Sequence, residues 1–190
     1  PYTTLFRSIA MDKVRHIKDI IEHQQQVASG PRFAQDEDLA LLVQQAVDLQ
    51  LHFLVKNRIQ TEVQVDPLPR IQTNKRKFLQ VLENLIKNGA ESVLEANGSQ
   101  RRLVIRAHAA EDGMIRIDVQ DTGAGIEASN LERIFRSGFT TKSNGHGFGL
   151  HFCANAMTEL GGRMEARSEG PGHGATFTLW MPVRTAEVNA

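Results

Sequence analysis

The chain has 190 residues, and its 22 Lys and Arg residues balance its 22 Asp and Glu residues, so the formal net charge at pH 7 is zero. This length suffices for one domain with a good core and one further element but hardly for two full domains, and the balanced charge gives no indication of a nucleic-acid partner. The single cysteine, Cys153, excludes an internal disulfide framework and favours a reducing, cytoplasmic compartment, while no apolar run approaches the roughly 18 residues of a membrane helix, so no membrane contact is predicted.

The first thirty residues are set apart from the rest by their patterns. Residues 1–8, PYTTLFRS, resemble the translated end of a widely used sequencing adapter and are interpreted as a cloning or assembly scar, with a natural lead-in to the next helix as the alternative. From Ile9 to Ala28, apolar residues recur at alternating steps of three and four, which predicts a helix with a narrow stripe typical of coiled coils. Gly30-Pro31 would end the helix at residue 30.

A helix and a strand are predicted next. Asp36 to about Leu54 is expected to be helical, with acidic residues in its first turn. The apolar face of this helix would consist of Leu39, Leu42, Val43, Ala46, Leu49 and Phe53. Ile59 to Val65 alternates like a short strand and is closed by the breaks at Asp66-Pro67 and Leu68-Pro69.

A long helix and a hairpin follow. Thr73 to Ala96 has the pattern of an amphipathic helix that ends at Asn97-Gly98. Two alternating runs, Arg102 to His108 and Met114 to Gln120, are predicted to pair as an antiparallel hairpin through Asp112-Gly113.

The chain closes with a helix and a second hairpin. Leu150 to Leu160 is predicted to be helical and capped by Gly161-Gly162. Arg163 to Ser168 and Ala175 to Pro182 would form the hairpin around a glycine-rich turn. Because helices and strands mix without regular βαβ alternation, the predicted fold class is α+β, with helices on one face of an antiparallel sheet.

Two groups of residues indicate a phosphate site. Gly145, Gly147 and Gly149 stand directly before the last helix, where glycine lets backbone N–H groups approach an anion and the helix start adds partial positive charge. On the long helix, one face holds Lys77, Val81, Asn84, Asn88 and Glu91, at steps of four and three. Carboxamide oxygens can ligate Mg²⁺ beside phosphates; a solvated helix surface is the alternative for this face taken alone.

Five motifs together resemble a known family. LENLIKNGAES, DTGAGI, IFRSGFTTK, GHGFGL and GPGHGATFTLWMP, in this order and spacing, closely resemble the ATP-binding catalytic domain of sensor histidine kinases, in the GHKL superfamily shared with DNA gyrase, the MutL repair protein and the heat-shock chaperone ATPase. The resemblance implies a domain over 36–186 with a Bergerat-type two-layer α/β sandwich, a mixed but mostly antiparallel sheet with helices on one face, preceded by one long helix.

The resemblance implies a binding site for ATP and Mg²⁺. Asn88 would bind Mg²⁺ with help from Asn84, and Lys87 would lie near the phosphates. Asp121 would accept the amino group of adenine, a donor that guanine lacks at that ring position. The rest of the implied base site comprises Gly123, Gly125, Ile126 and Thr176, with Thr176 supporting Asp121 from the neighbouring strand.

The resemblance also implies a lid over the phosphates. Phe135 and Phe139 would anchor the lid through their rings. The implied phosphate-facing residues are Thr140, Thr141, Lys142, Gly145, Gly147, Gly149 and Leu150, of which Lys142 is, with Lys87, a candidate phosphate contact.

One position favours phosphoryl transfer over hydrolysis. Hydrolysing members of the superfamily have a glutamate four residues before the metal-binding asparagine, and here that position is Asn84, which cannot act as a base. Glu83 points about 100° away around the helix and is expected to pair with Lys87. The chain also has Gly89 where alanine is usual, which is expected to loosen the helix.

The phosphate acceptor is expected to lie outside this sequence. His16 and His23 lack the flanking residues of an acceptor histidine, and residues 9–30 resemble the second helix of a truncated dimerisation hairpin. The sequence thus predicts a kinase fragment that does not phosphorylate itself. A response regulator receiver domain and a second copy, bound through residues 9–28, are the expected partners, and any membrane anchor would lie upstream.

Other classes remain open. DTGA is also the active-site string of retroviral-type aspartic proteases, but that fold is almost all β, against the helix at Thr73 to Ala96. A GHKL-type ATPase, a protein serine kinase, and a nucleotide-binding module without transfer activity are the further alternatives.

Overall fold

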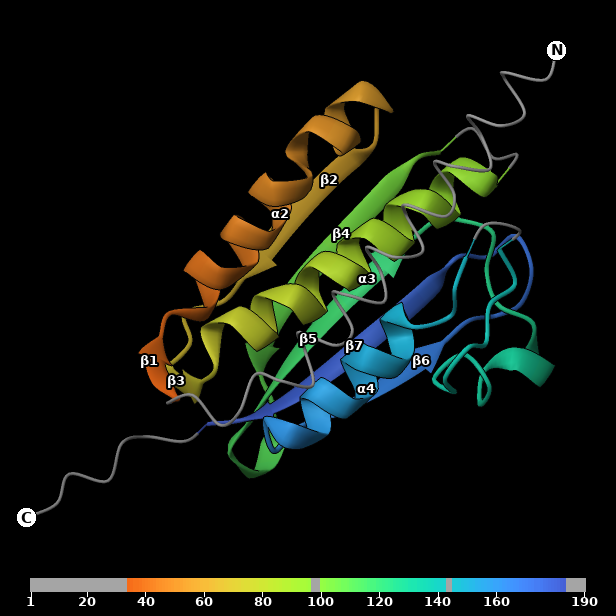
Figure 1. Ribbon diagram of the computed structural model, residues 1–190. Helices are drawn as coiled ribbons and strands as arrows, with labels where there is room; N and C mark the ends of the chain where they lie inside the picture. Colours follow the sequence, from red (N-terminus) through yellow and green to blue (C-terminus); the bar gives the residue numbers. More distant parts are fainter. Residues whose placement is uncertain (1–33, 97–99, 143–144, 184–190) are drawn as a thin grey trace, which may run out of the picture. The chain divides into compact units, whose positions relative to one another are not determined.

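The computed structural model describes residues 34–96, 100–142 and 145–183 (Figure 1). The predicted scar and the predicted helix of residues 9–28 lie outside the described residues, as do residues 184–186 of the predicted domain. The elements, in chain order, are β1 (Gln35–Glu37), α2 (Leu39–Lys56), β2 (Gln60–Val65), β3 (Ile71–Thr73), α3 (Lys75–Glu95), β4 (Arg102–Ala109), β5 (Met114–Asp121), α4 (Gly149–Glu159), β6 (Arg163–Arg167) and β7 (Ala175–Pro182). Within the described part of the chain, no helix is long and apolar enough to cross a membrane.

The domain has two layers. Five strands form one sheet in the order β2-β4-β5-β7-β6, in which β2 and β4 are parallel and every other neighbouring pair is antiparallel. The three helices α2, α3 and α4 lie on one face of this sheet (Figure 1). The predicted two-layer α/β fold and both predicted hairpins, β4-β5 and β6-β7, are therefore confirmed.

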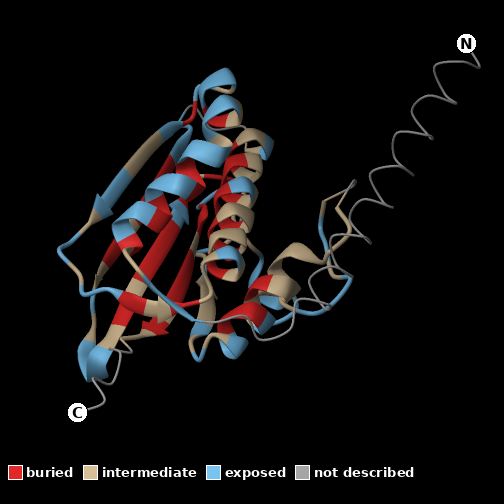
Figure 2. Ribbon diagram, turned by 60° about the vertical axis from the view of Figure 1, so that its left-hand side comes forward, coloured by how far each residue is buried: buried red, intermediate tan, exposed pale blue. Residues whose placement is uncertain are grey.

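The core lies between the helices and the sheet (Figure 2). On β5, burial follows the period of two that a strand imposes, so Ile115, Ile117 and Val119 point towards the helices. Asp121 continues this series and also lies on the helix side. α3 buries the broadest face, with Phe78, Val81, Leu82, Leu85, Ile86, Gly89, Ala90 and Val93. The strand pattern therefore places a carboxylate at the end of the core, beneath α3.

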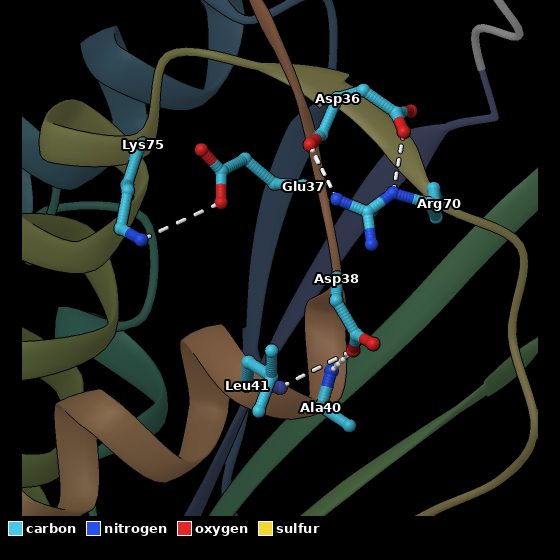
Figure 3. A network of polar contacts seen from close by, with 7 residues as sticks. All are labelled: Asp36, Glu37, Asp38, Ala40, Leu41, Arg70 and Lys75. Atoms are coloured by element: carbon cyan, nitrogen blue, oxygen red, sulfur yellow. Dashed lines mark hydrogen bonds and ion pairs between the residues drawn. The ribbon is translucent and has the colours of Figure 1, made fainter.

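The prediction that the first domain helix begins at Asp36 is wrong, because Asp36 and Glu37 belong to the short strand β1, which pairs with β3. Figure 3 shows the contacts that hold this segment: Arg70 Nη2 donates to the backbone oxygen of Asp36 (2.7 Å), and Lys75 pairs with Glu37 (3.6 Å). Asp38 is the N-cap of α2, with its Oδ1 accepting the N–H of Ala40 at 2.9 Å. The acidic residues thus precede the helix rather than forming its first turn.

The apolar face predicted for α2 is correct except at Leu49. Leu39, Leu42, Val43 and Ala46 are buried, but Leu49 is 61% exposed. Val47 and Leu54 are buried in its place. Because α2 carries leucine on both its buried and its exposed face, the positions of apolar residues do not by themselves show which face is buried.

We expect Asp38→Ala to lower the free energy of unfolding by about 1 kcal/mol, because two N–H groups at the start of α2 lose their acceptor. Those groups belong to Ala40 and Leu41, at 2.9 and 3.3 Å from Asp38 Oδ1. Urea unfolding measures the change. Asp48→Ala is the matched control, since Asp48 lies inside α2 and alanine there favours the helix. An equal loss in both variants would contradict the capping role.

Candidate nucleotide-binding site

A buried carboxylate is the first feature of the site. Asp121 ends β5 with only 4% of its surface exposed. Its Oδ1 accepts the N–H of Gly123 at 2.8 Å and the hydroxyl of Ser92, from α3, at 3.1 Å. Burial raises the pKa of Asp121, while these two donors, the N–H of Ala175 and the charge of Lys142 act in the opposite direction. The hydrogen bonds keep a costly buried carboxyl group in a fixed orientation.

The turn after Asp121 packs against α3. A Cβ at Gly123 would lie 2.1 Å from Ser92 Oγ and 2.4 Å from the Ser92 carbonyl carbon, so only glycine fits there. The N–H of Ala124 donates to the backbone oxygen of Ser92 at 3.1 Å. The end of α3 therefore fixes both the carboxylate and the turn that follows it.

The turn between β6 and β7 holds the other side of the same loop. Gly172 N–H donates to Ala124 O at 2.7 Å, and Gly174 N–H donates to Gly123 O at 3.1 Å. Gly125 has a φ of +73°, and a Cβ there would lie 2.1 Å from Gly170 O. Both of the predicted base-site glycines, Gly123 and Gly125, are thus positions of close backbone approach.

A serine that we did not predict joins these turns. Ser168 Oγ donates to Gly174 O at 2.6 Å and accepts the N–H of Ile126 at 3.0 Å. It also accepts the N–H of Gly170 at 3.2 Å. A serine directly before a glycine-rich turn was the available signal, because serine hydroxyls commonly bind local backbone groups. Ser92, also unpredicted, lies one helical turn after Asn88 and could have been found from that spacing.

The strand register does not bring Thr176 to Asp121. Ala175 is the residue of β7 directly opposite Asp121, and Thr176 lies opposite Gln120. Because side chains alternate between the two faces of a strand, Thr176 lies on the sheet face away from the helices. Support for Asp121 from β7 comes instead from the N–H of Ala175.

The two carboxamides of α3 meet the start of α4. A Cβ at Gly149 would lie 3.8 Å from Asn84 Oδ1 and 3.9 Å from Asn88 Nδ2. Two amides and the N-terminus of an 11-residue helix are therefore side by side, although they are far apart in the sequence. Leu150, in the first turn of α4, packs partly buried against the core. Asn84 and Asn88 could hold a metal ion beside phosphate groups that approach the helix start.

Three other ionisable residues lie close in sequence or in space to these amides: Cys153 on α4, and Glu83 and Lys87 on α3. Cys153 is buried, and burial raises its pKa to about 12. Burial also raises the pKa of Glu83. Among the ion pairs of the described residues, none joins Glu83 to Lys87, and Lys87 is exposed. The predicted pairing of Glu83 with Lys87 is therefore not formed.

Gly89 has a packing role that we did not predict. It is buried, and a Cβ there would lie 2.7 Å from Leu103 Cδ1 and 3.4 Å from Asp121 Cβ. α3 continues through this position without a break up to Glu95. The glycine thus lets the helix approach the sheet beside Asp121.

Residues 135–142 and 145–149, which we call the lid segment, are anchored by both predicted phenylalanines. Phe135 and Phe139 pack partly buried against the core. The Arg133 guanidinium lies 4.6 Å from the centre of the Phe139 ring, a cation–π contact. The Phe135 backbone oxygen lies 3.0 Å from His151 Nδ1 on α4.

Inside the lid segment, the predicted phosphate-facing residues form a tight turn. Thr140 and Thr141 are exposed, and Thr140 Oγ1 accepts the N–H of Lys142 at 3.1 Å. Gly145 N–H donates to Lys142 O at 3.1 Å, so it is engaged within the turn. Gly147 has a φ of +72° and packs against the backbone of Gly138 and Phe139.

The side chain of Lys142 leaves this turn and reaches α3. Its Nζ lies 2.6 Å from Glu91 Oε2. The lid segment is thereby tied to the helix face that also holds Asn84 and Asn88.

With this geometry, the comparisons with known proteins identify the family. Residues 73–185 match the family described as histidine kinase-, DNA gyrase B-, and HSP90-like ATPase. The match covers more than half of the chain, and the chain belongs to this family. The domain is an ATP-binding domain of the histidine kinase type.

Curated relatives are sensor kinases. The sensor protein FixL of Bradyrhizobium diazoefficiens is 32% identical over 170 residues, which cover 89% of this chain and 32% of that protein. The sensor histidine kinase ZraS of Escherichia coli K12 is 36% identical over 154 residues, 75% of this chain and 32% of that protein. The chain thus spans about a third of the length of these relatives.

Solved structures share the fold. The nucleotide-free catalytic domain of histidine kinase ThkA has a TM-score of 0.70 and 26% identity, covering 80% of this chain and 97% of that domain. Full-length ShkA in complex with AMPPNP has a TM-score of 0.76 and 24% identity, covering 92% of this chain and 37% of that one.

We expect Gly123→Ala to lower the free energy of unfolding by about 1–3 kcal/mol, because its methyl group would overlap the backbone of Ser92. Thermal or urea unfolding checks this value. Gly149→Ala is the matched control: its nearest neighbouring atom would be 3.8 Å away and its φ is not positive. Equal stability of the two variants would mean that the turn does not pack against α3 as described.

Proposed function

We propose that this domain binds Mg-ATP and donates the γ-phosphoryl group to a histidine of a two-component sensor kinase, for relay to an aspartate of a response regulator. The observation that supports it best is the arrangement around α3: a buried carboxylate beside its last turns, and two carboxamides that meet the start of α4. The buried carboxylate suits recognition of the adenine ring, and the two carboxamides suit the phosphates with their metal ion.

The surroundings of Asp121 support the choice of adenine. Ser92 and Gly123 both donate to Oδ1, and a carboxylate offers about four acceptor sites, so Asp121 retains capacity for a ligand donor. Adenine presents an amino group where guanine presents a carbonyl oxygen. A carboxylate oxygen attracts the amino group and repels the carbonyl oxygen, so Asp121 would select ATP over GTP.

The chemistry of α3 supports a metal ion held without carboxylates. Among the described residues, no group of three or more His, Cys, Asp or Glu side chains could hold a metal ion. The amide oxygens of Asn84 and Asn88 are neutral ligands and add no negative charge beside a triphosphate. These residues fit Mg²⁺, which would neutralise the phosphate oxygens when bound.

Phosphoryl transfer, rather than hydrolysis, fits the side chains beside the start of α4. Asn84 occupies the position next to Gly149, and a carboxamide cannot take a proton from water. Glu83, the adjacent carboxyl group, points about 100° away around the helix. The acceptor would be a histidine imidazole: its nitrogen forms the bond to the γ-phosphorus while the bond to the β-phosphate oxygen breaks and ADP leaves.

The acceptor histidine and the partners extend this proposal. We place the acceptor upstream of residue 9 on the first helix of a dimerisation hairpin, with residues 9–30 as its second helix. A second copy and a cytoplasmic response regulator receiver domain would be the partners. A GHKL-type ATPase, a protein serine kinase and a module that binds nucleotide without transfer are the competing functions.

Asp121→Asn is expected to keep the fold and to weaken ATP binding at least about tenfold. Asparagine retains an Oδ1 acceptor for Ser92 and Gly123, but it replaces the second acceptor by a donor. Isothermal titration with ATP measures the loss. Unchanged affinity would remove the assignment of Asp121 to adenine.

The same variant tests the buried charge. Because burial raises the folded-state pKa of Asp121 above its usual 3.8, its contribution to stability is greatest at low pH and is lost as the pH rises through the folded pKa. Asparagine does not titrate. Without nucleotide, Asp121→Asn is therefore expected to be at least as stable as wild type at pH 7, with the difference shrinking towards about pH 4.

Phosphoryl transfer is tested with γ-labelled ATP. We expect residues 1–190 to bind Mg-ATP without labelling themselves, and to label an added histidine-bearing hairpin from a related sensor kinase. Acid-labile label on that hairpin would support the proposed transfer. Steady release of free phosphate would favour the ATPase, and stable label on His16 or His23 would contradict an upstream acceptor.

A further inference from the structure

One ion pair connects the lid segment with α3. Lys142 Nζ lies 2.6 Å from Glu91 Oε2, and their side chains are 28% and 33% exposed. Glu91 follows Asn88 by three residues, so the two share a face of the helix. The ammonium group thus pairs with a residue that lies one helical turn from Asn88 on α3.

Lys142 also lies within electrostatic reach of the base site. Its positive charge is one of the influences that counteract the raised pKa of Asp121. Lys142 thus pairs directly with Glu91 from α3, while its charge also acts on Asp121 from β5.

The backbone of Lys142 is held independently of this ion pair. Its N–H donates to Thr140 Oγ1 at 3.1 Å, and its carbonyl oxygen accepts the N–H of Gly145 at 3.1 Å. Neither contact involves Glu91. The side chain of Lys142 can therefore exchange its partner without breaking either of these backbone contacts.

Electrostatics favours such an exchange when phosphates are present. A partly exposed lysine–carboxylate pair contributes little free energy. Phosphate oxygens are strong acceptors for an ammonium group, and a triphosphate carries several negative charges. The same charges would be repelled by Glu91, which lies on the face of α3 that holds Asn88.

We propose that Glu91 is the counter-ion that Lys142 leaves when the phosphates of a nucleotide bind, so that Glu91 sets the affinity of the site for phosphorylated nucleotides. This inference rests on the proposed ATP site. Glu91 acts through Lys142 and needs no contact with the base. Its effect therefore depends on the phosphates of the ligand and is absent for adenosine.

The test measures the binding of ATP, ADP and adenosine to Glu91→Gln by isothermal titration. We expect ATP to bind about twofold to fivefold more tightly than to wild type, the range set by one partly exposed ion pair, with adenosine unchanged. The matched control is Glu159→Gln, which removes the partner of Lys77, near the start of α3. Lys77 is 14 residues from Glu91, about 21 Å along the helix, so this control should leave ATP affinity unchanged.

A second pair of variants separates partner exchange from simple repulsion. In a Lys142→Gln background, adding Glu91→Gln should tighten ATP binding by clearly less than it does alone, because only the repulsion by Glu91 is relieved and there is no ammonium group to release. An equal gain in both backgrounds would show repulsion by Glu91 alone and would overturn the proposal. Weaker ATP binding by Glu91→Gln would overturn it as well, since Glu91 would then assist the phosphates or the metal ion.

Failure of this inference is distinct from failure of the proposed function. Wild type that binds ATP, together with Glu91→Gln of unchanged ATP affinity, would overturn only the role of Glu91. Wild type that binds neither ATP nor adenosine would overturn both.

Discussion

The burial of one carboxyl group, Asp121, determines how the site is built. A carboxylate at the end of a core strand costs free energy unless donors surround it, and here Ser92, Gly123 and the N–H of Ala175 supply them. The turn that carries the Gly123 N–H can approach Ser92 on α3 only because Gly123 has no side chain. Gly123 and Gly125 in the DTGAGI motif are therefore packing requirements beside the buried carboxyl group as much as sources of flexibility.

α3 links the two halves of the site. Successive turns of this helix present Asn84, Asn88 and Ser92, the first two to the start of α4 and the third to Asp121. Glu91, between the last two, reaches the lid segment through Lys142. A rigid helix with a deeply buried face thus fixes the separation between the proposed metal site and the base site. The lid segment depends on this helix for one of its attachments.

Sequence patterns predicted most of the fold, and the errors have physical causes. Both hairpins and α3 follow from periodicity, since their buried faces are continuous. The start of α2 was misplaced because Asp36 pairs with a three-residue strand, too short to show alternation. Leu49 was assigned to the core because α2 has leucine on both faces. The predicted contact of Thr176 with Asp121 fails by one residue of strand register: Ala175 lies opposite Asp121, and Thr176 lies on the other face of the sheet. Ser92 and Ser168 had local signals in their spacing and in the glycine-rich turn, but their hydrogen-bond partners depend on which turns pack together.

The account depends on Asp121 as the group that recognises adenine. Competition between ATP and GTP for the wild-type chain, followed at equilibrium with Mg²⁺ present, tests this most directly because both nucleotides have the same phosphates. A site that hydrogen-bonds the adenine amino group is expected to bind ATP at least about 100-fold more tightly than GTP. Equal affinities would contradict the account, because the phosphates alone would then determine binding.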